Sequence, residues 1–124
     1  MGTFSDLVAN SWLDAVFNAT SYSEAGVFAK LHLGDPGSAG TSNPAAETTR
    51  QAVSCSAAAS RAITSDANTE WTNVSATETY SHISIWDANS AGNFLGRDDL
   101  SSTAPVTAGD TFRIPTGDFD ASVT

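Results

Sequence analysis

The sequence predicts a mainly β protein: an antiparallel β-sandwich or barrel of about seven or eight short strands, with one amphipathic helix at the N-terminus. Ser and Thr make up 32 of the 124 residues and charged residues only 15%, a composition that favours strands and turns over helical bundles. Helical spacing of apolar residues is confined to residues 1–20, and from Gly26 the period becomes two. Because no helical pattern separates the later strands, we do not expect a parallel sheet.

The chain is expected to form one domain, 1–124, because 124 residues is close to the commonest domain size and long enough to bury a core. No internal repeat divides it. We expect the helix within 1–20 and the β-sandwich over 26–124, with a long loop at 34–48.

The predicted helix has Thr3 as its N-cap, Asp6 in its first turn, and its end near Asn18. Its apolar residues form a wide stripe, which we expect to pack on the protein's own sheet or on a neighbouring subunit, with its own sheet favoured. The stripe consists of Phe4, Leu7, Val8, Trp12, Leu13, Val16 and Phe17.

The strands that follow are predicted from alternating apolar and polar residues. In the strongest of them, we expect Tyr80 to point to the opposite face from Ile83 and Ile85. In chain order, the predicted strands are 27–33, 49–55, 60–64, 70–74, 77–88, 94–100, 111–114 and 117–124.

The loop 34–48 begins with "GDPG", which resembles the start of a ligand-binding loop. It lacks the lysine and Ser/Thr ending of a phosphate-binding loop, whereas Asp35, Pro36 and Gly37 are typical turn residues. Because the loop has almost no apolar content, we expect it to gain order from a partner.

Charge and cysteine content exclude several function classes. The net charge of −9, with only five Lys and Arg residues, argues against binding to nucleic acid or to an anionic membrane. Cys55 is the single cysteine, so it has no disulfide partner in the chain, and we expect it to be a small buried residue. No signal peptide or membrane-spanning segment is visible, and we expect synthesis in a cytoplasm.

The segment 87–98 is spaced like a calcium-binding loop, with an acidic residue at its first and twelfth positions. Ala91 and Leu95 supply no side-chain oxygen at two ligand positions, and the predicted flanking elements are strands. We therefore predict a hairpin with Gly92 at its tip.

The remaining chemistry-bearing residues form no recognisable site. His32 and His82 show no metal-ligand spacing, and Ser and Asp are too abundant for a catalytic triad to stand out. Asp118 and Asp120 are expected on a solvated face. We therefore predict no catalytic, cofactor-binding or metal-binding residues and no cofactor. The tryptophans Trp12, Trp71 and Trp86 leave sugar stacking open as an alternative to packing.

Four stretches carry a family resemblance: "LHLGDPGSAGTSN", "TRQAV", "WTNVSATETYSHISIWDANSAGNFLG" and "VTAGDTFRIPTGDFDASV". They resemble small virion proteins encoded in the structural modules of tailed bacteriophages of actinobacteria. Members are described as tail-fibre, head-fibre, minor tail or capsid-decoration proteins. The resemblance covers most of the chain, and its motifs are turns and strand cores.

The resemblance implies a non-enzymatic virion structural protein made in the host cytoplasm. The main expectation is a decoration or cement protein on the outer surface of the head. The alternatives are a minor tail or tail-fibre component, or a carbohydrate-binding module for host adsorption. The expected partners are the major capsid protein or other virion proteins, and further copies of the same chain in a homo-oligomer.

Overall fold

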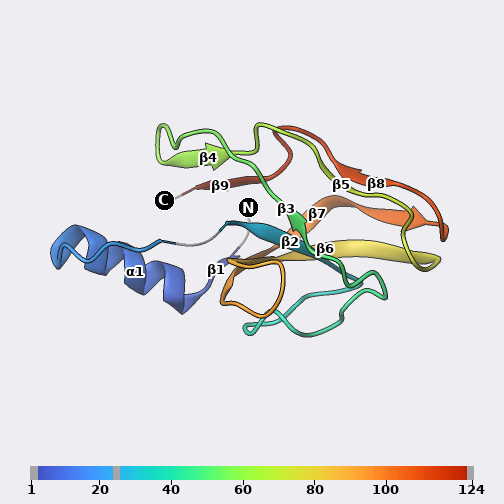
Figure 1. The fold of residues 1–124 in the computed structure, drawn as a ribbon, viewed down its shortest axis with the longest axis horizontal. Helices are drawn as coiled ribbons and strands as arrows, with labels where there is room; N and C mark the ends of the chain where they lie inside the picture. Colours follow the sequence, from blue (N-terminus) through green and yellow to red (C-terminus); the bar gives the residue numbers. More distant parts are fainter. Residues whose placement is uncertain (1–2, 24–25, 123–124) are drawn as a thin grey trace.

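A computed structural model describes residues 3–23 and 26–122, and Figure 1 shows its fold. The prediction of a mainly β, antiparallel fold with one N-terminal helix is confirmed. The described part of the chain holds nine strands; the predicted strand positions 123–124 lie outside it. The elements are β1 (Thr3–Phe4), α1 (Asp6–Phe17), β2 (Phe28–His32), β3 (Gln51–Ala52), β4 (Ala62–Thr64), β5 (Thr69–Trp71), β6 (Glu78–Trp86), β7 (Phe94–Val106), β8 (Phe112–Ile114) and β9 (Asp120–Ser122).

The strands form two layers. One layer is a five-stranded sheet in the order β1-β7-β6-β2-β3, and the other consists of the two-stranded ribbons β4-β9 and β5-β8 (Figure 1). Aromatic rings join the layers, since the ring of Phe112 on β8 lies 5.2 Å from that of Tyr80 on β6 and 5.8 Å from that of its ribbon partner Trp71. Apolar side chains between the layers make the core, because the inner faces of both layers are removed from water there.

The alternation of side chains along β6 changes phase within the strand. Pairing with β7 is irregular between Tyr80 and His82, which is a β-bulge. As a result Tyr80, Ile83 and Ile85 all belong to the buried core. The expectation that Tyr80 points away from the two isoleucines is therefore wrong, because the bulge breaks the period of two.

The N-terminus of the helix also differs from the prediction. Thr3 and Phe4 form β1, pairing with β7, so the N-cap is Ser5, whose Oγ accepts a hydrogen bond from the Val8 N–H at 3.4 Å. Gly96 permits this pairing, since a Cβ there would lie 2.7 Å from the Thr3 carbonyl oxygen. The helix ends before its C-cap, Asn18, as expected.

The loop 34–48 packs against its own domain. The Ala45 N–H donates to the Leu31 carbonyl at 3.2 Å, and the Glu78 carboxylate accepts from the N–H groups of Ala46 and Glu47. Ala45 is buried. The expectation that this loop needs a partner for its order is wrong, because backbone hydrogen bonds fix it where apolar content does not.

A buried chain of hydrogen bonds ties the loop 34–48 to the sheet. The Trp86 Nε1–H donates to Ser84 Oγ at 2.8 Å, and Ser84 Oγ lies 2.7 Å from His32 Nε2. His32 Nδ1 lies 2.8 Å from the Ser42 carbonyl oxygen in the loop. Burial lowers the pKa of His32, so the neutral ring donates from Nδ1 and accepts from the Ser84 hydroxyl at Nε2.

Replacing Ser84 with Ala should lower the free energy of unfolding by about 2–4 kcal/mol, because it leaves the buried Trp86 Nε1–H and His32 Nε2 without a partner. Urea denaturation followed by tryptophan fluorescence measures this loss. The matched control is Ser101→Ala at an exposed position of β7, where we expect a change within about 0.5 kcal/mol. Equal effects of the two substitutions would show that the hydrogen-bond chain contributes nothing.

Stability should fall as the pH is lowered from 7.5 to 5.5. The pKa of folded His32 lies below the unfolded value of about 6.5, so the unfolded chain binds more protons in this interval. The stabilisation is complete above pH ~6.5 and is lost as the pH falls through the folded pKa. Urea midpoints across this range should become pH-independent in His32→Asn and keep the slope in His82→Asn. A flat profile for the unsubstituted protein would contradict this.

Candidate functional site

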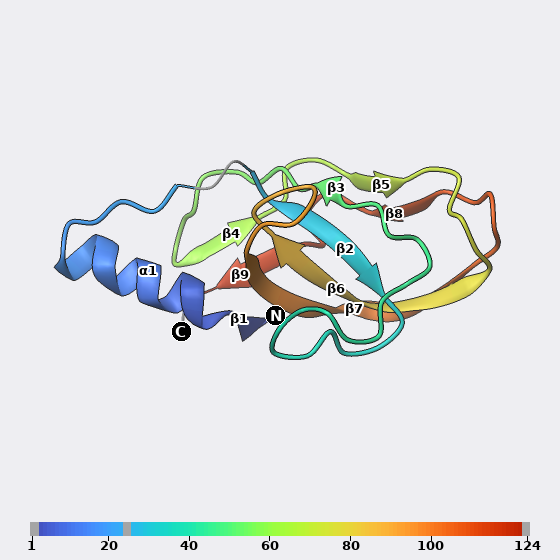
Figure 2. The same cartoon turned by 60° about the horizontal axis from the view of Figure 1, so that its bottom comes forward.

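The helix α1 is only partly covered by its own domain. Val8 is its one buried residue, and the ring of Trp12 packs on that of Phe4 at 4.9 Å. In both Figure 1 and Figure 2, α1 runs away from the strands. Its large apolar side chains are exposed by 38% at Leu7, 41% at Trp12, 57% at Leu13, 74% at Val16 and 78% at Phe17.

The favoured expectation that the whole stripe docks on its own sheet is therefore wrong. The helix starts directly after β1, the outermost strand, and points away from the sheet, so the five-stranded sheet does not extend along its second half. Exposed apolar surface concentrated on one helix marks an interaction site. The second half of α1 is thus the leading candidate for a contact with another protein.

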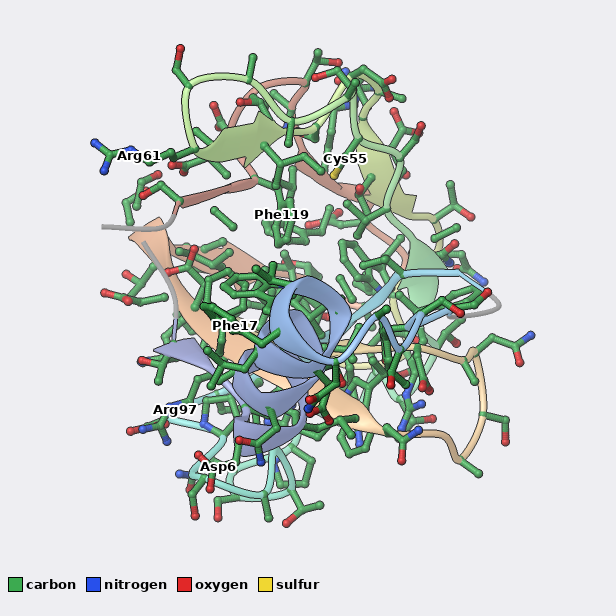
Figure 3. The ribbon with its side chains drawn as sticks, turned by 90° about the vertical axis from the view of Figure 1, so that its left-hand side faces the viewer. Asp6, Phe17, Cys55, Arg61, Arg97 and Phe119 are labelled. Atoms are coloured by element: carbon green, nitrogen blue, oxygen red, sulfur yellow. The ribbon has the colours of Figure 1, made fainter. Side chains whose placement is uncertain are left out.

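An apolar groove of about 530 Å³ lies beside α1. Phe4 and Trp12 form its wall on the helix side, and the β4-β9 ribbon and the turn before it form the other wall. In Figure 3, Arg61 extends outward from this ribbon, and Phe17 lies beside the end of the helix. We call this feature the helix groove; its lining residues are Phe4, Trp12, Ala58, Arg61, Ala62, Ile63, Ala121 and Ser122.

A second, more polar cleft of about 200 Å³ separates β7 from β8. Burial raises the pKa of Asp98 in it, while the Asp98 carboxylate accepts the N–H of Asp99 at 2.9 Å. Asp118 lines the cleft at an exposed position, and Asp120 is exposed as well. The Arg113 guanidinium at the cleft is paired with a carboxylate of β5 at 2.6 Å. The Asp98 carboxylate is thus used by the backbone, and the Arg113 guanidinium is used by the Glu70 carboxylate.

The segment 87–98 forms a hairpin, as predicted. Asp87 accepts hydrogen bonds from the backbone and side-chain N–H groups of Asn93, at 2.7 and 2.8 Å, which lowers the pKa of Asp87. Arg50 Nη1 donates to the carbonyls of Ala88 and Ala91 at 2.8 and 2.6 Å. The Asp87 carboxylate is thus used by Asn93, and the Asn93 carbonyl, the backbone ligand position of a calcium loop, accepts the Asp87 N–H at 3.2 Å.

The two histidines are neighbours in the sheet but do not form a metal site. His32 and His82 are paired across β2 and β6. Both ring nitrogens of His32 are used in the buried hydrogen-bond chain, and His82 Nδ1 lies 2.7 Å from Ser81 Oγ. Among the described residues, no group of three or more His, Cys, Asp or Glu side chains is placed to hold a metal ion.

Cys55 is half-buried rather than fully buried, and it packs against the core. Burial raises the pKa of its thiol, which disfavours the reactive thiolate. In the part of the chain that the structure describes, no helix is long and apolar enough to cross a membrane.

The three tryptophans differ in how much ring surface they leave open for stacking on a sugar. Trp71 is buried and donates its Nε1–H to the Thr49 carbonyl at 2.8 Å. Trp86 is buried too, and the Arg50 guanidinium lies over its ring at 4.1 Å. Only Trp12 keeps an exposed ring surface, and it lines the helix groove.

Replacing Arg50 with Ala should lower the free energy of unfolding by about 2 kcal/mol, because the hairpin carbonyls lose a charged donor and Trp86 loses its cation. Thermal and urea denaturation measure the change. The matched control is Arg113→Ala, which removes an exposed ion pair and should lower the free energy of unfolding by about 0–1 kcal/mol. A smaller loss for Arg50→Ala than for the control would refute the structural role of Arg50.

Comparison with known proteins identifies the family. The model of one protein family, described as podophage GP4 fiber I protein gp80, matches residues 3–122. The match spans nearly the whole chain, so the chain belongs to this family, and it is a phage virion protein of the fibre type. No curated protein matches the chain.

Proposed function

We propose that this member of the podophage fibre family is a non-enzymatic structural subunit of a virion fibre in a phage with an actinobacterial host. The observation that carries the proposal is the family match over residues 3–122. The exposed half of α1 supports it, because a building block must keep apolar surface for its neighbours.

The fibre position replaces capsid decoration as the preferred location. The matching family is described as a fibre protein, and this description favours the tail-fibre alternative over a cement protein on the head. The acidic charge of −9 suits either outer position, since both lie away from packaged DNA.

The proposed partners are other virion proteins, and the proposed contact element is the projecting helix. Of the exposed large apolar side chains in the described residues, only Tyr22 and Leu33 lie outside α1. A carbohydrate-binding role has less support, because Trp71 and Trp86 are buried and Trp12 alone offers a ring face.

Immunogold electron microscopy of purified virions tests the location. Antibodies raised against the purified chain should place gold on the fibres, and antibodies first absorbed with the same chain serve as the control. Gold spread evenly over the head would contradict the fibre proposal and support decoration. Absence of the chain from virions, measured by mass spectrometry, would contradict both.

A further inference from the structure

The exposed end of α1 is apolar over a wide arc, which runs from Val8 and Trp12 past Val16 to Leu13 and Phe17. One face includes Val8 and Trp12 and turns toward the protein's own domain. Leu13 and Phe17 are four residues apart and form the second face, about 140° and 180° around the helix from Val8 at about 100° per residue. The domain covers the Val8 border of this arc and leaves the Leu13–Phe17 border exposed, and an exposed apolar border of this kind marks an interaction site.

The helix groove has the chemistry to cover that second face. Its walls are mostly apolar, and Arg61 stands at its rim on an exposed turn (Figure 3). Arg61 forms no ion pair within the part of the chain that the structure describes. On α1, Asp14 lies three residues before Phe17 and therefore flanks the second face, and the last helical turn holds no basic residue.

We propose that the Leu13–Phe17 face of one chain packs into the helix groove of a second copy of this chain, with Asp14 meeting Arg61 across the interface. The exchange is reciprocal, so each copy supplies one helix and one groove. A chain cannot fill its own groove with this face, since the face points away from its own domain. This inference names the partner of the contact element in the proposed function, and it rests on that proposal only in treating α1 as a contact element.

The available area fits a weak, concentration-dependent pair. Leu13 and Phe17, exposed by 57% and 78%, leave roughly 250–300 Å² of surface uncovered per chain. Two helices and the groove walls opposite them would together bury roughly 1,000 Å², which is below the range of about 1,200–2,000 Å² for standard interfaces and within the range of transient ones. A different protein is not needed to explain the exposed face, because the same chain carries the complementary groove and the unpaired cation.

Sedimentation velocity of the purified full chain over a range of concentrations tests the proposal. We expect a concentration-dependent dimer, and the double substitution Leu13→Ser with Phe17→Ser should weaken it at least about tenfold. The matched control is Ser11→Ala on the same helix, about 120–160° around it from Leu13 and Phe17 and outside the helix groove, which should leave dimerisation unchanged. Circular dichroism confirms that each variant is folded. A chain that stays monomeric at all concentrations, or a dimer that the double substitution leaves intact, would overturn the proposal.

Charge reversal tests the arrangement of the two chains. Arg61→Glu and Asp14→Arg should each weaken the dimer about fivefold, because each places like charges opposite one another. Combining both substitutions in one chain restores the attraction and should recover most of the lost affinity. Failure of the combination to recover it would overturn the proposed pairing. These measurements need no virions, so their failure leaves the immunogold result on fibre location standing.

Discussion

The hydrogen-bond chain from Trp86 through Ser84 and His32 to the loop 34–48 is the constraint on which much of the fold depends. It connects strands β6 and β2 to the loop 34–48 through hydrogen-bonding groups that are shielded from water. Buried polar groups are costly when left unpaired, so each member of the chain allows essentially one arrangement of the others. The neutral His32 ring is central, since it donates on one side and accepts on the other. The loop is thereby held to one position on the sheet despite its polar composition.

A second constraint acts at the N-terminus. The pairing of Thr3 and Phe4 with β7 sets where the chain leaves the sheet, and α1 begins two residues later. The direction in which the chain leaves the sheet, rather than the hydrophobicity of α1, decides which residues of α1 the domain covers. Val8 lies close to the exit and is buried, whereas Phe17 lies far from it and is exposed. The same apolar stripe thus contributes to the core at one end and to the outer surface at the other.

Features that depend on neighbouring residues were predictable from the sequence. The end of the helix at Asn18, the turn at Asp35 and the hairpin tip at Gly92 follow from local side-chain preferences. Features that depend on residues far away in the sequence were not predictable. The order of the loop 34–48 comes from Glu78 and from strand β2, more than ten residues away, and no local pattern shows those bonds.

The candidate site shows the same division. The sequence identifies the apolar stripe of α1 but not its exposure, which follows from the pairing of β1 beside Gly96. The groove was missed for a similar reason, because its walls come from Phe4, Trp12 and a ribbon made of β4 and β9, which are close only in the folded chain.

The larger sheet is bordered by β1 and β3, each only two residues long. A short edge strand presents few unpaired N–H and C=O groups to another chain. Beyond Arg97, no described strand lies on the outer side of β7, and there Asp98, Asp99 and Pro105 disfavour β-strand addition. Open-ended aggregation through the backbone is thereby discouraged at high local concentration. The contact proposed for α1 accordingly uses side chains and leaves the sheet edges unpaired.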